Sequence, residues 1–123
     1  QMAIDKRIFI VCSKKNERYP DAPDMPATVM INPKITSHGN AIKKDWEGCL
    51  SVPAIRGLVP RYHEINITYQ DRANNIHKAA YTGFLARIFQ HELDHLNGLT
   101  FVDRVESSRD LYSESEWRKQ FVV

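Results

Sequence analysis

The sequence predicts an α+β domain in which short antiparallel strands surround one central helix. Two observations carry this prediction. Much of the chain consists of short apolar or alternating runs separated by Pro, Gly, Asn and Asp, which is typical of strands joined by turns. One longer run, residues 83–96, has helical periodicity instead. With 123 residues, the chain fits a single domain over residues 1–123.

The expected strands are short runs of β-branched and aromatic residues. In residues 64–69, Ile65, Ile67 and Tyr69 alternate with polar residues, which predicts a half-buried strand. The Asn32-Pro33 pair is expected to end the second strand. In chain order, the expected strands are 7–11, 28–31 with a continuation at 34–36, an extended segment at 45–53, 64–69, 76–81 and 99–102.

Residues 16–26 are predicted to form a rigid surface loop. Pro20, Pro23 and Pro26 stand at every third position, and neither a helix nor a paired strand accepts that spacing. A polyproline ligand motif is the alternative, and turn chemistry favours the loop. Two further turns are expected, at residues 38–40 and 71–75.

Residues 83–96 are predicted to form the central helix. Thr82 is a plausible N-cap, and Asn97-Gly98 is typical of a helix end. The polar tail from residue 104 is expected either to dock as a helix near Trp117 or to be loosely ordered.

The most informative segment is Gln-His-Glu-Leu-Asp-His at residues 90–95. His91 and His95 stand one helical turn apart, so both imidazoles can bind one divalent metal. Glu92 lies beside the first ligand, where it can reach water at the metal without binding the metal itself. On a helical wheel the histidines share a narrow arc with Phe84 and Ile88, which predicts that they lie on the apolar, inward face of the helix.

A lone buried histidine is more often a satisfied core residue than a ligand. Two histidines with a glutamate on one buried face need a joint explanation, however, and a metal supplies it. Cys49, in the segment Glu47-Gly48-Cys49-Leu50-Ser51, is a candidate third ligand, because catalytic sites commonly use three protein ligands and leave one position open. By itself, Cys49 would more often be a small buried apolar residue. The pair of motifs indicates a hydrolytic metalloenzyme.

Two other residues, Glu47 and Cys12, are expected to have structural roles only. Glu47 is expected to make only a local hydrogen bond or ion pair. Cys12 ends an apolar run and is expected in the core. A disulfide between Cys12 and Cys49 is less favoured than a reducing compartment, since Cys49 has a use as a ligand.

Composition excludes several function classes. The formal net charge of +2 is too small to indicate nucleic-acid binding, and no basic-aromatic interleaving supports it. No apolar run approaches the roughly 20 residues that span a bilayer. The sequence has no signal-peptide pattern.

Taken together, residues 47–51 and 90–95 resemble the second and third signature motifs of the peptide deformylases. The flanking segments 52–61 and 96–104 also resemble that family, so the similarity runs from Gln1 to about residue 104. Gln1 is similar to the last residue of the family's first motif, a glycine-rich segment. The resemblance therefore implies that the family's N-terminal helix and that glycine-rich segment are not part of residues 1–123.

The resemblance implies a fold and a reaction. Cys49, His91 and His95 would hold one divalent metal, and Glu92 would act first as a general base and then as an acid. Fe(II) is the expected physiological ion, and Zn, Ni or Co can substitute for it. The substrate would be an N-formylmethionyl peptide, from which the formyl group leaves as formate.

The resemblance also implies residues that contact the substrate. The Leu50 backbone N–H and the Gln1 side chain would stabilise negative charge on the formyl oxygen. Leu50, Ile88 and Phe84 would line the pocket for the methionine side chain.

The implied setting is the cytoplasm of a bacterium, with a phage-encoded protein or an organelle after removal of a transit peptide as alternatives. Ribosome proximity is plausible from the function. Two other functions stay open: a metal-binding but inactive deformylase remnant with an incomplete cleft, and an H-E-x-x-H metallopeptidase. Cys49 argues against the metallopeptidase, because those sites usually add His or Glu.

Overall fold

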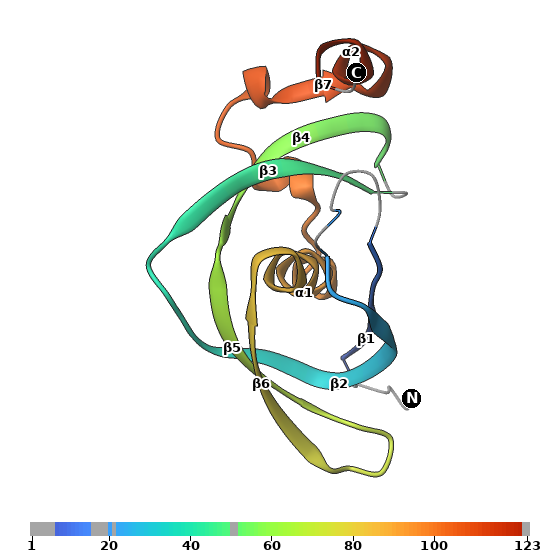
Figure 1. Cartoon of the computed structure of the whole chain (residues 1–123), viewed down its shortest axis with the longest axis vertical. Coiled ribbons are helices and arrows are strands. Elements are labelled where there is room, and N and C mark those ends of the chain that lie inside the picture. The colour runs from blue at the N-terminus through green and yellow to red at the C-terminus, as the bar shows by residue number, and fades with distance from the viewer. Residues whose placement is uncertain (1–6, 16–19, 21, 50–51, 122–123) are drawn as a thin grey trace.

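The computed structural model describes residues 7–15, 20, 22–49 and 52–121. In this part of the chain, a four-stranded sheet with the order β1-β2-β5-β6 and a three-stranded sheet with the order β3-β4-β7 lie on either side of helix α1 (Figure 1). All strand pairs are antiparallel, which confirms the predicted α+β class. The elements are β1 (Ile8–Ser13), β2 (Met25–His38), β3 (Ile42–Cys49), β4 (Val52–Tyr62), β5 (Glu64–Gln70), β6 (Ile76–Thr82), α1 (Gly83–Leu96), the 3₁₀ turns η1 (Phe101–Asp103) and η2 (Ser108–Asp110), β7 (Leu111–Ser113) and α2 (Glu114–Phe121).

The core lies between the four-stranded sheet and α1. Phe9 and Val11 of β1 and Ile65 and Ile67 of β5 all point inward, as the period of two in a strand requires. Phe89 of α1 meets them, and its ring contacts that of Phe9 edge to face with centroids 5.2 Å apart. Burying each of these side chains stabilises the fold by roughly 1.5–3 kcal/mol. This packing fixes α1 as a rigid support.

A glutamine joins α1 to the other sheet. The Gln90 side chain accepts a hydrogen bond from the Tyr62 backbone N–H at 3.0 Å and donates to the Tyr62 carbonyl at 2.8 Å. Gln90 is buried and immediately precedes His91. The helix is therefore held in register with β4 at the position where the metal motif begins.

Several predicted elements are confirmed. Helix α1 covers residues 83–96 and follows Thr82 at the N-cap, although the Thr82 side chain makes no capping hydrogen bond. The strands predicted at 7–11, 64–69 and 76–81 are β1, β5 and β6. In the turn between β5 and β6, the Asp71 carboxylate accepts backbone hydrogen bonds from Ala73 and Asn75.

Strand β2 is longer than predicted. The Asn32-Pro33 pair does not end it, because the pairing of β2 with β5 shifts register between Ile31 and Lys34 and then continues. Asn32 adopts a φ of 50°, which asparagine tolerates better than most residues. The proline is thereby accommodated in a bulge. Of the predicted loop at 16–26, residues 16–19 and 21 lie outside the described residues, and Met25 and Pro26 belong to β2.

Two other expectations are wrong. Residues 99–102 do not form a strand: the Thr100 backbone N–H donates to the Asp103 carboxylate at 2.9 Å, and η1 begins at Phe101. Such local bonds compete with strand pairing. Cys12 is exposed rather than buried, since Val11 and Ser13 occupy the inward positions of β1.

The tail docks as a helix, which confirms the first of its two predicted forms. Strand β7 pairs with residues 55–57 of β4, and α2 follows it on the outer side of the three-stranded sheet (Figure 1). Trp117 is 4% exposed, and its ring centroid lies 6.5 Å from that of Trp46. Neither α1 nor α2 is long and apolar enough to cross a membrane.

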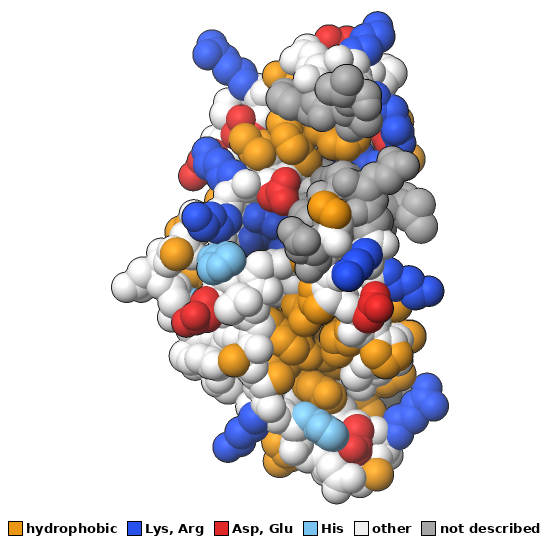
Figure 2. Space-filling view, in the orientation of Figure 1, with side chains coloured by type: hydrophobic (Ala, Val, Ile, Leu, Met, Phe, Trp, Pro, Cys, Tyr) orange, Lys and Arg blue, Asp and Glu red, His pale blue; other side chains and the backbone are white. Residues whose placement is uncertain are grey.

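Surface charge is scattered. On the face that Figure 2 draws, Lys and Arg side chains are spread from top to bottom, and apolar side chains gather both in the upper part and in the lower half. This distribution agrees with the small net charge of +2.

Candidate metal centre

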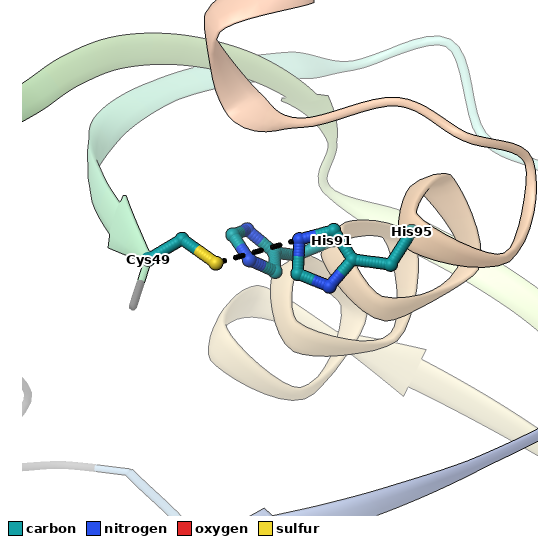
Figure 3. Close-up of side chains that lie close together, drawn as sticks. All are labelled: Cys49, His91 and His95. Carbon is teal, nitrogen blue, oxygen red and sulfur yellow. Dashed lines mark hydrogen bonds between the residues drawn. The ribbon is translucent and has the colours of Figure 1, made fainter. Parts of the chain in front are cut away.

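Cys49, His91 and His95, the three predicted ligands, lie close together (Figure 3). Cys49 is the last residue of β3, and the histidines stand on successive turns of α1. The Cys49 Sγ lies 3.5 Å from His95 Nε2, and one ligand atom from each of the three residues lies within 4.8 Å of the others.

The three side chains fit a divalent metal. Zinc–sulfur bonds of about 2.3 Å and zinc–nitrogen bonds of about 2.0–2.1 Å, set at tetrahedral angles, separate the two ligand atoms by about 3.5 Å. The Sγ to Nε2 distance of 3.5 Å agrees with that value. One thiolate and two imidazoles are a ligand set for Zn, Fe, Co or Ni. Three protein ligands leave a further position for water or substrate.

The histidines border the core instead of lying inside it, which corrects one prediction. Ala86 and Phe89 make up the deeply buried side of α1, whereas the His91 and His95 side chains are 14% and 29% exposed. The face of α1 that carries His91 and His95 is therefore not the deeply buried face of the helix. Partial exposure leaves both imidazoles within reach of solvent.

Glu47 contacts the ligand cluster directly, beyond the local hydrogen bond or ion pair expected from the sequence. Its buried carboxylate accepts a hydrogen bond from His91 Nδ1 at 2.8 Å. Because an ionised carboxylate can only accept, this bond places a proton on Nδ1, and Nε2 would be the nitrogen free to bind a metal. Regular strand alternation does not connect Glu47 with Cys49, because the pairing of β3 with β4 shifts register between these two residues. The packing of β3 against α1 places Glu47 beside His91.

Two buried arginines hold Glu47. Arg61 donates to both of its carboxylate oxygens, at 3.0 and 2.9 Å, and Arg87 Nη1 donates at 2.5 Å. Burial by itself raises the pKa of Glu47, but the hydrogen bonds from His91 and Arg61 outweigh burial and lower that pKa to about 2. The carboxylate is therefore ionised at neutral pH and balances the buried arginines.

Asp94 extends the same network to the segment after α1. It accepts a hydrogen bond from Arg61 Nη1 at 2.6 Å and two from Arg104, at 3.0 and 2.8 Å. Asp94 is 5% exposed and lies inside the H-E-x-x-H segment. The network therefore fixes the helix that carries both histidines against β4 and the residue that follows η1.

The remaining predicted residues are placed as follows. Glu92 is half-buried, with its carboxylate 3.7 Å from His95 Nδ1. Ile88 packs against the core cluster, and Phe84 lines a cavity of about 260 Å³ at the start of α1. Gln1 and Leu50 lie outside the described residues. The roles of these five residues, like the metal-ligand roles of Cys49, His91 and His95, stay predictions.

Comparison with known proteins decides the family. A family model described as polypeptide deformylase matches residues 1–110. The chain belongs to the polypeptide deformylase family. This confirms the resemblance that the motifs at 47–51 and 90–95 predicted.

Individual deformylases agree in sequence and structure. Peptide deformylase 2 of Nostoc sp. is 55% identical over 119 residues, which cover 97% of this chain and 66% of that protein. A class I type b peptide deformylase from Acinetobacter baumannii, bound to Met-Ala-Ser, is 46% identical with a TM-score of 0.76, covering 80% of this chain and 62% of that one. A probable deformylase from Synechococcus phage S-SSM7 is 38% identical with a TM-score of 0.68, covering 85% and 67%.

The curated deformylases are longer than this sequence. The chain covers 66% of the Nostoc protein and 60% of peptide deformylase 2 of Ralstonia nicotianae, which is 44% identical over 106 residues and 86% of this chain.

Proposed function

We propose that this chain removes the formyl group from N-formylmethionyl peptides and releases formate. The observation that carries the proposal is the convergence of Cys49, His91 and His95, in a deformylase family member, with His91 oriented by Glu47. The Acinetobacter baumannii relative binds Met-Ala-Ser, which begins with the residue that deformylation would expose.

The chemistry follows from the side chains. A divalent ion held by Cys49, His91 and His95 would supply a Lewis acid that acidifies water and polarises the formyl carbonyl. Glu92 accepts the proton of the attacking water and delivers it to the nitrogen of the leaving amine. The amide C–N bond breaks, the water oxygen stays in formate, and the peptide keeps a free amino terminus.

Four other residues would position the substrate. The Leu50 backbone N–H and the Gln1 side chain donate hydrogen bonds to the formyl oxygen, where negative charge develops. The methionine side chain enters an apolar pocket lined by Leu50 and Ile88, with Phe84 at its margin.

We further propose one Fe(II) ion per chain as the physiological metal, with Zn, Ni or Co as substitutes. A mixed thiolate and imidazole set accepts all four ions. The proposed place of action is the cytoplasm of a bacterium, where formylated chains leave the ribosome.

Replacing Cys49 with serine is expected to weaken metal binding. The substitution exchanges a thiolate for a hydroxyl, which is a poor ligand for these ions at neutral pH, and leaves two imidazoles. Metal content after gel filtration should fall well below one ion per chain, with the fold kept by circular dichroism. Metal content and affinity equal to those of the parent protein would show that Cys49 is not a ligand.

A pair of matched peptides tests the proposed function. Formyl-Met-Ala-Ser and unformylated Met-Ala-Ser are each incubated with anaerobically metal-loaded protein, and formate, free amine and peptide fragments are assayed. The proposal predicts formate from the formylated peptide and no cleavage of either chain. Internal cleavage of both peptides would indicate a metallopeptidase, and bound metal without turnover would indicate an inactive metal-binding domain.

A further inference from the structure

We propose that helix α2 sets the charge selectivity of the peptide cleft, because Glu114 neutralises Arg56 beside the metal ligand Cys49. This inference rests on the proposed function. The selectivity concerns the substrate residues that follow the methionine. Helix α2 would thereby take part in substrate selection.

Arg56 is held by α2 from two directions. Its Nη2 donates to the Glu114 carboxylate at 3.0 Å, and its Cζ lies 5.2 Å from the centre of the Trp117 ring. The Arg56 and Glu114 side chains are 21% and 32% exposed, so solvent screens this pair only partly. The guanidinium is thus fixed by an ion pair and an aromatic face.

The held guanidinium lies directly against the metal-binding strand. A Cβ atom placed on Gly48 would come within 2.1 Å of Arg56 Nη1 and 2.8 Å of its Cζ. A side chain at position 48 would therefore require the Arg56 guanidinium to move. Gly48 precedes Cys49 in β3, so Arg56 packs against the residue next to the proposed metal ligand.

The same residues line an open cavity. Cys49, Pro53, Arg56 and Glu114 are among the residues that line a space of about 400 Å³. A peptide whose first residue reaches the metal centre would place its following side chains in or near this space. The side chains of those residues would therefore meet the Arg56–Glu114 pair.

Charge balance then determines selectivity. With Glu114 ionised, the Arg56–Glu114 pair carries no net charge and offers little preference between acidic and basic substrates. Arg118 also pairs with Glu114, at 3.3 Å, but its side chain is 61% exposed, so solvent largely screens its charge. The hydrogen bond from Arg56 lowers the pKa of Glu114, so the carboxylate stays ionised at neutral pH. Without the Glu114 charge, Arg56 would be an uncompensated cation at the cleft and would favour an acidic substrate residue.

The test compares kcat/KM for formyl-Met-Asp-Ser and formyl-Met-Lys-Ser in the parent protein and in Glu114→Gln. The ratio of the two values should shift toward the acidic peptide by roughly twofold to fivefold, the range of a partly exposed ion pair. Glu116→Gln is the matched control: it removes the same charge from α2 at an exposed residue that bonds Gln120 instead. Its ratio should equal that of the parent, and metal content should be unchanged in both variants.

A second variant separates charge from structure. Arg56→Gln combined with Glu114→Gln removes both charges, and its ratio should return to the parent value. Equal ratios in Glu114→Gln and Glu116→Gln, or a raised ratio that persists in the double variant, would overturn the inference while formate release still upheld the proposed function. Absence of formate release from the metal-loaded parent protein would instead contradict the proposed function on which this inference rests.

Discussion

Replacing Glu92 with glutamine is expected to lower the turnover number for formate release by at least ~10²-fold, the usual contribution of a general base. Glutamine keeps the size of the side chain but cannot accept a proton from water. Because Glu92 is 31% exposed and does not belong to the ligand cluster, the variant should keep its fold and one metal ion per chain. Formate assays with metal analysis of the same sample measure both quantities.

Glu64→Gln is a suitable control, since it makes the same substitution at an exposed residue of β5. It should leave turnover unchanged. If Glu92→Gln turned over at a near-normal rate with metal bound, Glu92 could not be the base, and the proton would have to be accepted by another group.

Replacing Glu47 with alanine is expected to destabilise the metal-free protein by about 3–5 kcal/mol, because one partner of a buried ion pair is removed. Arg61 is 5% exposed and Arg87 is 7% exposed, so both would lose a carboxylate partner away from water. Loss of the hydrogen bond to His91 Nδ1 should also weaken metal binding by roughly 10- to 100-fold. Chemical denaturation and competition with a metal chelator measure the two effects.

Glu47→Gln separates these effects from simple loss of volume. It keeps a side chain of the same size but removes the charge, so it should still destabilise the protein, whereas the exposed Glu116→Gln should not. If Glu47→Ala had the stability and metal affinity of the parent, the hydrogen bonds of Glu47 would contribute neither to the fold nor to the metal site.

The parts of the fold that the sequence predicted are those set by local periodicity. The 14 residues of α1 carry a helical pattern with Thr82 before them and Gly98 after them, and the bounds agreed. The two histidines could be paired from their spacing alone. Cys49 was predicted as the third ligand from a second motif, residues 47–51, and the family resemblance of that motif supported the prediction.

Strand β4 was missed because its sequence lacks a strand pattern. Pro53, Gly57 and Pro60 interrupt it, yet it pairs with β3 along most of its length. A Cβ on Gly57 would lie 2.9 Å from Phe101, so the glycine allows η1 to pack closely on the strand. Among the described strands, β7 pairs with β4 only at residues 55–57, which leaves one side open at Pro60. Tertiary contacts, not local preference, determine this strand.

The support beneath the metal centre was missed for a related reason. Arg61 and Arg87 are 14 and 40 residues from Glu47, and no local pattern pairs an arginine with a particular carboxylate at such distances. The ion pairs of Glu47 with the two arginines can be identified only once β3, β4 and α1 are packed together. The sequence therefore identified the side chains that would bind the metal but not those that orient them.

Formate release per bound metal ion tests the central claim most directly. Metal-free protein is titrated anaerobically with Fe(II) or Ni(II), and the rate of formate release from formyl-Met-Ala-Ser is measured at each occupancy. The account predicts that the rate rises in proportion to bound metal and reaches its maximum at one ion per chain. A rate independent of metal, or one full metal ion per chain without formate release, would contradict it.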